Sequence, residues 1–78
     1  MRLFKSGIHK IGVGDVFIIT KFHDKNIETH MNKFGIFVNY EMKCIFKNDR
    51  LIIVNINGRD VCIDGKIDVD IRKAPKSD

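Results

Sequence analysis

The side chains that could bind a metal or act as nucleophiles are few, and their spacing fits no functional motif. They are His9, His23, His30, Cys44 and Cys62. None of them occurs in a C-x-x-C or H-x-x-x-H spacing, which would place two ligands on one tight turn. Isoleucine and phenylalanine surround the cysteines, and apolar surroundings keep a thiol protonated and unreactive. We therefore expect no metal, no cofactor and no nucleophilic catalysis.

The carboxylates of the second half also have a structural explanation. Asp64 precedes a glycine in a turn, while Asp68 and Asp70 alternate with apolar residues as the solvent-exposed positions of a strand. Asp60 is the one acid that the pattern places on a core face. A chain of 78 residues has little room for a pocket that excludes water. We expect a protein that is not an enzyme.

The basic side chains point to an acidic partner. Lysine and arginine outnumber aspartate and glutamate by 14 to 10, giving a net charge of +4, and a positive field favours nucleic acid. The predicted strand register gathers several of these residues on one face. Like charges set opposite one another destabilise a sheet unless an anion or solvent screens them. The candidate phosphate contacts are Lys43, Lys47, Arg50, Arg59 and Lys66.

Three two-residue turn signals organise residues 36–72. They are Asn48-Asp49, Asn57-Gly58 and Asp64-Gly65. Such pairs tolerate the positive φ of a type I′ turn, whose twist matches that of paired strands. The sequence therefore predicts a four-stranded antiparallel meander. A two-residue loop also fixes the register, so Lys47 is expected opposite Arg50 and Val54 opposite Val61.

Alternation along these strands defines two faces. The first is interpreted as the core face and carries Met42, Cys44, Phe46, Leu51, Ile53, Cys62, Ile67, Val69 and Ile71. The second is apolar in the middle and charged at its rim, and it carries Ile45, Ile52, Val54, Ile56, Val61 and Ile63. An apolar centre within a charged rim is typical of a protein interface. We expect the N-terminal half, a second copy of the chain or a protein partner to cover this second face.

The N-terminal half is expected to close the sheet. Residues 1–14 predict an edge strand or extended arm, and residues 15–23 a strand whose opening, Gly14 to Ile19, resembles the first strand of many small SH3-like barrels. Ile27, Met31 and Phe34 have helical spacing, with Asp24 or Asn26 as the cap and Gly35 at the end, although a strand fits residues 25–34 as well. Residues 36–47 predict a long strand that bends near residues 39–41.

These features predict one small all-β domain over residues 1–73, followed by a disordered polar tail over residues 74–78. The expected fold is a small antiparallel barrel or curled sheet, SH3-like in size, with one short helical turn. One strand separates the two cysteines, by about 9–10 Å. This is too far for a disulfide, so both are expected to be free, buried and reduced. No apolar run reaches membrane-spanning length, so we expect no membrane span, and we expect no secretory signal.

The sequence as a whole predicts a small cytoplasmic binding protein that is not a catalyst. Nucleic-acid binding through the basic end of the sheet is the first hypothesis. The alternative is a protein-interaction or inhibitor module, such as a phage-encoded effector of a host protein, that uses the face containing Ile52, Val54 and Ile56. The abundance of isoleucine, lysine and asparagine fits an AT-rich genome, and thus a low-GC bacterium, its phage or a large DNA virus.

Overall fold

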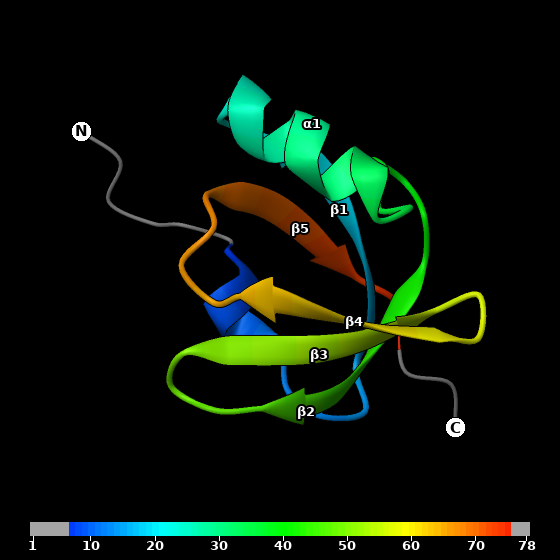
Figure 1. Cartoon of the computed structure of the whole chain (residues 1–78). Coiled ribbons are helices and arrows are strands. Elements are labelled where there is room, and N and C mark those ends of the chain that lie inside the picture. The colour runs from blue at the N-terminus through cyan, green and yellow to red at the C-terminus, as the bar shows by residue number, and fades with distance from the viewer. Residues whose placement is uncertain (1–6, 76–78) are drawn as a thin grey trace.

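A computed structural model describes residues 7–75 of the chain (Figure 1). Its elements in chain order are η1 (Ile8–Lys10), β1 (Val16–Phe22), α1 (Lys25–Lys33), β2 (Met42–Lys47), β3 (Leu51–Ile56), β4 (Arg59–Asp64) and β5 (Val69–Lys73), where η1 is a 3₁₀ turn. The five strands form one antiparallel sheet in the order β4-β3-β2-β1-β5. The predicted class, a curled antiparallel sheet with a small helical element, is confirmed.

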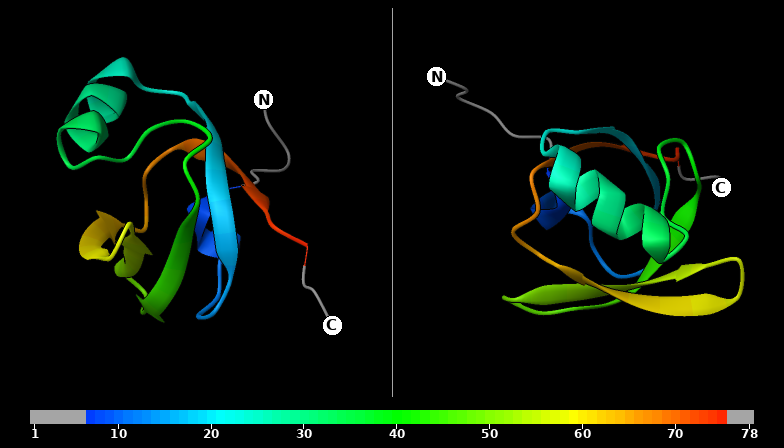
Figure 2. Two further views of the ribbon diagram at one scale, coloured as in Figure 1. Left: turned by 90° about the vertical axis from the view of Figure 1, so that its right-hand side faces the viewer. Right: turned by 45° about the horizontal axis from the view of Figure 1, so that its top comes forward.

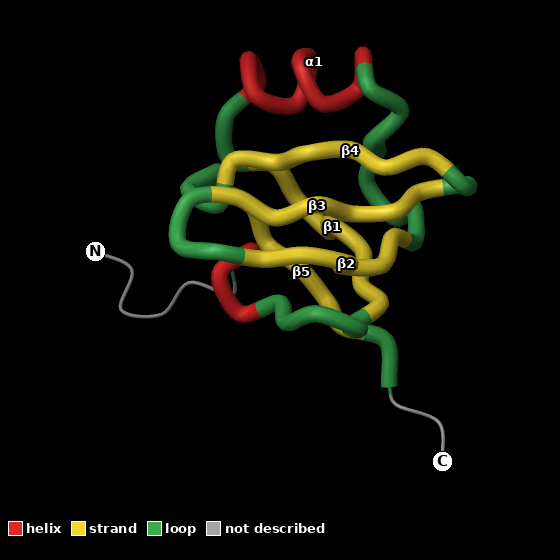
Figure 3. The backbone as a smooth tube through the Cα atoms, turned by 60° about the horizontal axis from the view of Figure 1, so that its bottom comes forward, coloured by secondary structure: helices red, strands yellow, loops and turns green. Residues whose placement is uncertain are grey.

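The sheet curls so that its two ends face each other across a core without joining (Figure 2). Strands β2, β3 and β4 run side by side across the front of Figure 3, and β1 and β5 cross behind them. The core between these layers joins residues of both halves of the chain. Its largest members are Phe17, Ile8, Ile11, Ile19, Ile36, Met42, Ile52, Ile56 and Ile63. The N-terminal half therefore covers the face of β3 and β4 that the sequence left open.

The β3–β4 hairpin forms in the predicted register. Ile56 lies opposite Arg59 and Val54 opposite Val61. Asn57 and Gly58 have φ of +53° and +82°, the positive values that a type I′ turn requires at both central positions. In this hairpin, the turn residues alone were sufficient to determine the pairing.

The predicted fourth strand of the meander is wrong. After β4 the chain turns at Gly65, whose backbone N–H donates to Arg50 O at 2.8 Å. It then crosses to the other end of the sheet, where β5 pairs with β1 and sets Val69 opposite Phe22. The Asp64-Gly65 signal marks a turn, but it does not determine with which strand the next strand, β5, pairs. Pairing with β1 places Val69 in the core, where the sequence also predicted it.

The β2–β3 connection also differs from the predicted two-residue turn. Lys47 lies opposite Ile52, and the three residues from Asn48 to Arg50 connect the two strands. The Asn48 carboxamide oxygen accepts hydrogen bonds from Arg50 N at 2.8 Å and Leu51 N at 3.0 Å. Such a side-chain turn is a known alternative for asparagine. The register then shifts between Cys44 and Phe46, which leaves Ile45 as the extra residue of a β-bulge.

These shifts reverse the predicted faces of β3 and β4. The buried residues are Ile52, Val54, Ile56 and Ile63, whereas Cys62 is exposed and Leu51 and Ile53 are half-buried. On β2 the predicted core residues Met42 and Cys44 are buried, but Phe46 is exposed. The two cysteines therefore lie on opposite faces. The expectation that both are buried is correct for Cys44 and wrong for Cys62.

A second bulge interrupts the alternation of inward and outward side chains along β1. The β1–β5 register shifts between Ile19 and Lys21, so Phe22 joins Phe17 and Ile19 on the buried side. Before β1, the chain forms the 3₁₀ turn η1 instead of a continuous edge strand. Residues 1–6 of the predicted arm lie outside the described part of the chain. At the other end, Ala74 N donates to Val16 O at 2.7 Å, and residues 76–78 of the predicted tail are likewise outside the described residues.

The ambiguous segment after β1 is a helix. Asp24 is the N-cap of α1, and its carboxylate accepts from Asn26 N at 2.8 Å and Ile27 N at 3.3 Å. Gly35 has a φ of +83°, as expected for the residue that ends a helix. Met31 is buried and Ile27 half-buried, but Phe34 is exposed, because the helix ends before it.

The long strand predicted from residue 36 begins only at Met42. The preceding residues form a turn in which Asn39 has a φ of +73°, so the predicted bend is present. The helical elements within residues 7–75 are all too short to cross a membrane.

Replacing the helix cap tests the placement of α1. We expect Asp24→Ala to lower the free energy of unfolding by about 1 kcal/mol, because two backbone N–H groups lose their acceptor. The measurement is urea unfolding followed by circular dichroism. Asp49→Ala, in an exposed turn, is the matched control and is expected to change stability by less than about 0.5 kcal/mol. Equal effects of the two variants would contradict the capping geometry.

Candidate functional site on the outer face of the sheet

Strands β2, β3 and β4 carry an apolar surface on the side away from the core, which we call the outer face. It consists of Ile45, Phe46, Leu51, Ile53 and Cys62. Phe46 lies opposite Ile53, and Ile53 lies opposite Cys62, so these three side chains form one row across the three strands. Figure 3 shows these strands at the front of the molecule, with no other described element in front of them.

The bulge in β2 produces this surface. Cys44 points inward opposite Val54, and after the unpaired Ile45 the chain resumes with Phe46 pointing outward opposite Ile53. Ile45 and Phe46 are consequently 41% and 45% exposed, although they are adjacent residues of one strand. Regular alternation would have hidden one of the two. The bulge therefore exposes an aromatic and a branched aliphatic side chain together.

The thiol beside the bulge is shielded from solvent. Burial raises the pKa of Cys44, and the hydrogen bond that its Sγ donates to Phe46 O at 3.4 Å opposes that rise, as does the positive charge of Lys47. Because burial dominates, the thiol stays protonated. Cys44 is thus a core residue that packs beside the bulge.

Charged side chains of both signs surround the outer face. At one end Lys43, Asn55 and Asp60 lie in a row, and Asn55 Nδ2 donates to Asp60 Oδ1 at 2.8 Å. At the other end are Asp64, whose Oδ1 accepts from Lys66 N at 2.8 Å, and Arg50. The Arg50 carbonyl accepts from Gly65 N, so the two turns that carry Arg50 and Lys66 touch. The rim is mixed in charge and not uniformly basic.

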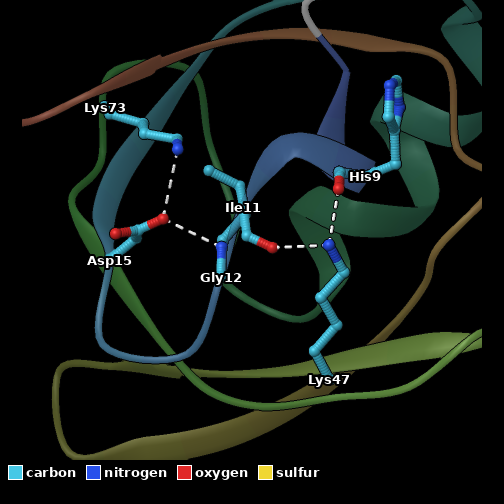
Figure 4. A network of polar contacts seen from close by, with 6 residues as sticks. All are labelled: His9, Ile11, Gly12, Asp15, Lys47 and Lys73. Carbon is cyan, nitrogen blue, oxygen red and sulfur yellow. Dashed lines mark hydrogen bonds and ion pairs between the residues drawn. The ribbon is translucent and has the colours of Figure 1, made fainter.

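Lys47, one of the five predicted phosphate contacts, is directed into the protein. Its ammonium donates to His9 O and to Ile11 O, the latter at 2.7 Å, and so ties β2 to the turn η1 (Figure 4). Nearby, Asp15 Oδ2 accepts from Gly12 N at 2.8 Å and lies 3.3 Å from Lys73 Nζ. Lys47 is half-buried, and its donors serve the backbone of this chain. It is therefore a structural lysine.

Arg59 is also engaged within the protein. Its Nη2 donates to Phe34 O at 2.9 Å, at the C-terminal end of α1. A Cβ at Gly35 would lie only 2.2 Å from that nitrogen, so the glycine makes room for the guanidinium. Of the predicted basic set, Lys43, Arg50 and Lys66 remain exposed with no such structural role among the described residues.

The predicted apolar interface is mostly interior. Ile52, Val54, Ile56 and Ile63 are at most 1% exposed and pack in the core. Val61 is half-buried against the same core, and only Ile45 of the predicted set lies on the outer face. Those residues cannot meet a partner without unfolding, because the N-terminal half already covers them. The apolar surface available for binding is the opposite one.

The outer face contains residues that the sequence interpretation assigned to the core. The signal that could have identified them is the pair Ile45-Phe46, because two adjacent apolar residues break the alternation of β2. Of the aromatic side chains on which a nucleic-acid base could stack, Phe37 and Tyr40 are exposed, with ring centroids 5.1 Å apart, but Phe17 is fully buried. Within residues 7–75, no three histidine, cysteine, aspartate or glutamate side chains are placed to hold a metal ion.

Removing the Lys47 ammonium tests its structural role. We expect Lys47→Met to lower the free energy of unfolding by about 1–3 kcal/mol, because two carbonyl oxygens lose a charged donor. Chemical denaturation measures the change. Lys66→Met is the control, since that exposed side chain makes no comparable contact in the described structure, and it is expected to change stability by less than about 0.5 kcal/mol. A harmless Lys47→Met would show that this lysine is free for other contacts.

Thiol labelling tests the reversed faces. In the folded protein we expect a thiol reagent to modify Cys62 readily and Cys44 only after unfolding, because one is exposed and the other buried. Mass spectrometry after native and denaturing reactions gives the modified residue. Raising the pH moderately leaves Cys44 protected, since burial raises the pKa of its thiol. Rapid native modification of Cys44 in a Cys62→Ser variant would refute the assigned faces.

Comparisons with known proteins provide no family for this chain: no family model, no curated protein and no solved structure matches it.

Proposed function

We propose that this protein is a small, non-catalytic binding module that docks on a partner protein through its outer face. The observation that supports the proposal is the exposure of Phe46 and Ile45 beside Ile53 and Cys62. Single exposed apolar residues are normal on a protein surface, but a continuous apolar row across three strands is typical of an interaction site. The same strands already pack a full core on their other side, so the fold itself makes no use of this row.

The chemistry of the outer face suits a protein partner. Its centre is apolar and holds an aromatic ring, the kind of side chain that most often dominates binding energy at interfaces. Its rim combines Lys43, Arg50 and Lys66 with Asp60 and Asp64. A desolvated apolar centre with a hydrated rim of mixed charge is the usual anatomy of a protein interface.

Nucleic-acid binding is the second candidate, and one observation favours it. The exposed Phe46 ring lies between basic side chains, so a base could stack on the ring while Lys43, Arg50 and Lys66 contact phosphates. Against this, Asp60 and Asp64 share the rim and would repel a phosphate backbone. Lys47 and Arg59 are also occupied by carbonyl groups of the chain. We therefore rank a protein partner first.

The proposed setting is the cytoplasm, where the exposed thiol of Cys62 would stay reduced. A module without catalytic groups acts by occupying a surface of a larger protein. That mode of action suits a phage-encoded or viral effector that blocks a host protein. A second copy of the chain is a further candidate partner for the outer face.

Two matched phenylalanine variants test the proposal. We expect Phe46→Ser to weaken partner binding by about tenfold or more, because a central aromatic contact is lost. Phe37→Ser is the control, since Phe37 is similarly exposed, at 39%, but lies outside the outer face. Binding is measured by quantitative affinity purification at low and high salt, with light scattering to detect dimers and a mixed DNA and RNA pool as competitor.

The salt dependence separates the two candidates. An apolar interface persists at high salt, whereas phosphate contacts weaken steeply as salt rises. Binding that survives high salt, ignores the nucleic-acid pool and is lost in Phe46→Ser supports the protein interface. Binding to the pool that high salt abolishes would instead support nucleic acid, and equal behaviour of the two phenylalanine variants would refute the outer face.

A further inference from the structure

One side of β4 has no neighbouring strand in the described structure, because β4 ends the sheet order. In an antiparallel pair, residues that exchange backbone hydrogen bonds alternate with residues that do not. In the β3–β4 hairpin, the first hydrogen-bonded pair is Ile56 and Arg59, which flank the type I′ turn. The hydrogen bond from Gly65 N to Arg50 O, at the other end of the hairpin, fits the same alternation. By this alternation, Asp60 and Cys62 direct their backbone N–H and C=O groups away from β3, towards the free edge.

No described segment covers this free edge. The backbone of α1 packs against β1, and the end of α1 is joined to β4 through the Arg59 side chain, at the start of the strand. Asp64 O, also on the free side, is taken by Ile67 N at 3.3 Å, which closes the turn after the strand. For Asp60 and Cys62, no backbone hydrogen bond to a segment beyond β3 occurs within residues 7–75. The edge is therefore open to another chain.

The outward side chains of β4 have a definite charge pattern. Asp60, Cys62 and Asp64 alternate along the strand, and all three are exposed. Each is the last side chain of a row that crosses neighbouring strands on the outer face. Asp60 lies beside Asn55, Cys62 lies beside Ile53, and Asp64 lies beside Leu51. On β2, the first two rows continue to Lys43 and Phe46. Neither carboxylate is in an ion pair with a basic side chain of the described residues. An added strand would place its own side chains directly beside these three.

A cleft of about 280 Å³ at the Asp64 end of the edge has the same sign of charge. It lies between the start of α1 and the turn after β4, and it is lined by Asp24, Ile27, Asp64, Lys66, Ile67 and Asp68. Asp24 and Asp64 place two carboxylates beside the one ammonium of Lys66 in this lining, although the whole chain carries a net charge of +4. A basic side chain entering from the edge would meet an opposite charge here.

We propose that the free edge of β4 accepts an extended basic segment of the partner protein as an additional strand. Its basic side chains lie beside Asp60 and Asp64, and an apolar side chain between them lies beside Cys62. Backbone hydrogen bonds to Asp60 and Cys62 hold the segment, and the alternate side chains select it. This inference rests on the proposed function, because the added strand extends the outer face by one row.

Charge also argues against the simplest competing occupant. If β4 paired with β4 of a second copy about Cys62, Asp60 of each chain would lie opposite Asp64 of the other, and directly opposed like charges destabilise a sheet. Exposed charges on an edge strand are a common protection against unwanted pairing. Here they exclude acidic segments and leave the edge selective for basic ones.

The test uses the whole protein and two synthetic peptides with alternating sequences. One has a Lys-Thr-Val-Thr-Lys centre, and the other has glutamate in place of both lysines. Amide hydrogen exchange, followed by NMR, reports each backbone group. We expect the lysine peptide to protect the amides of Asp60 and Cys62 and to bind about tenfold more tightly than the glutamate peptide, because two attractions replace two repulsions.

Two sets of variants separate the backbone contacts from the charge. Cys62→Pro removes the outward N–H at an edge position, where proline is tolerated, and is expected to abolish peptide binding, while Cys62→Thr keeps the N–H and the binding. The Asp60→Lys, Asp64→Lys double variant is expected to reverse the peptide preference, and it keeps the test decisive if Cys62→Pro does not fold. Equal binding of both peptides, or no protection of these amides, would overturn the proposal. So would protection that grows with protein concentration in the absence of peptide, since a second copy would then be the occupant.

The two proposals can fail separately. Edge pairing predicts that Cys62→Pro abolishes peptide binding whether or not Phe46→Ser affects the partner. If Phe46→Ser leaves partner binding intact while the lysine peptide still protects β4, the edge site stands without the outer-face function. If Phe46→Ser abolishes partner binding and neither peptide protects β4, the outer face binds its partner by side chains alone, and the edge inference is refuted.

Discussion

The direction in which the β3–β4 hairpin faces is the constraint on which the rest of the structure depends. One face of the hairpin is directed towards the core. Its side chains are buried against residues of the N-terminal half, and they are Ile52, Val54, Ile56 and Ile63. Full burial of each such side chain contributes about 1.5–3 kcal/mol. The opposite orientation would bury Leu51, Ile53 and Cys62, a shorter and less branched set that is flanked by Asn55 and Asp60. The larger apolar set takes the interior.

Once that direction is chosen, β2 must adapt to it. Its inward residues Met42 and Cys44 match β3 only because the chain inserts Ile45 as a bulge before Phe46. The bulge increases the twist of the strand pair, which helps the sheet to curl around its core. It also leaves two large apolar side chains in solvent. The surface that we assign to binding is thus a direct result of the adjustment that completes the core.

Several charged side chains serve the backbone of the chain itself, and this limits what they can do for a partner. Lys47 holds the carbonyl groups around η1, Arg59 holds the end of α1, and Asp15 joins Gly12 to Lys73. These basic side chains are therefore not available to bind phosphates. What remains outside is an apolar row with a mixed rim, next to an open and acidic edge at β4. These neighbouring features fit the proposed partner, which would have an apolar surface for the outer face and an extended basic segment for the β4 edge.

The sequence by itself determined the features that depend on neighbours in the chain. Asn57-Gly58 fixed a hairpin and its register, and the β-branched composition indicated a curled antiparallel sheet. Asp24 and Gly35 supplied the end signals of a helix, although the pattern between them fitted a strand as well. The tertiary structure decided everything that required comparing distant segments. Which face of the hairpin is buried depends on what the N-terminal half can cover, and the partner of β5 depends on the free side of β1. The roles of Lys47 and Arg59 depend on carbonyl groups more than twenty residues away. Alternation divides a strand into two faces, but only packing against the rest of the chain determines which of the two is the interior.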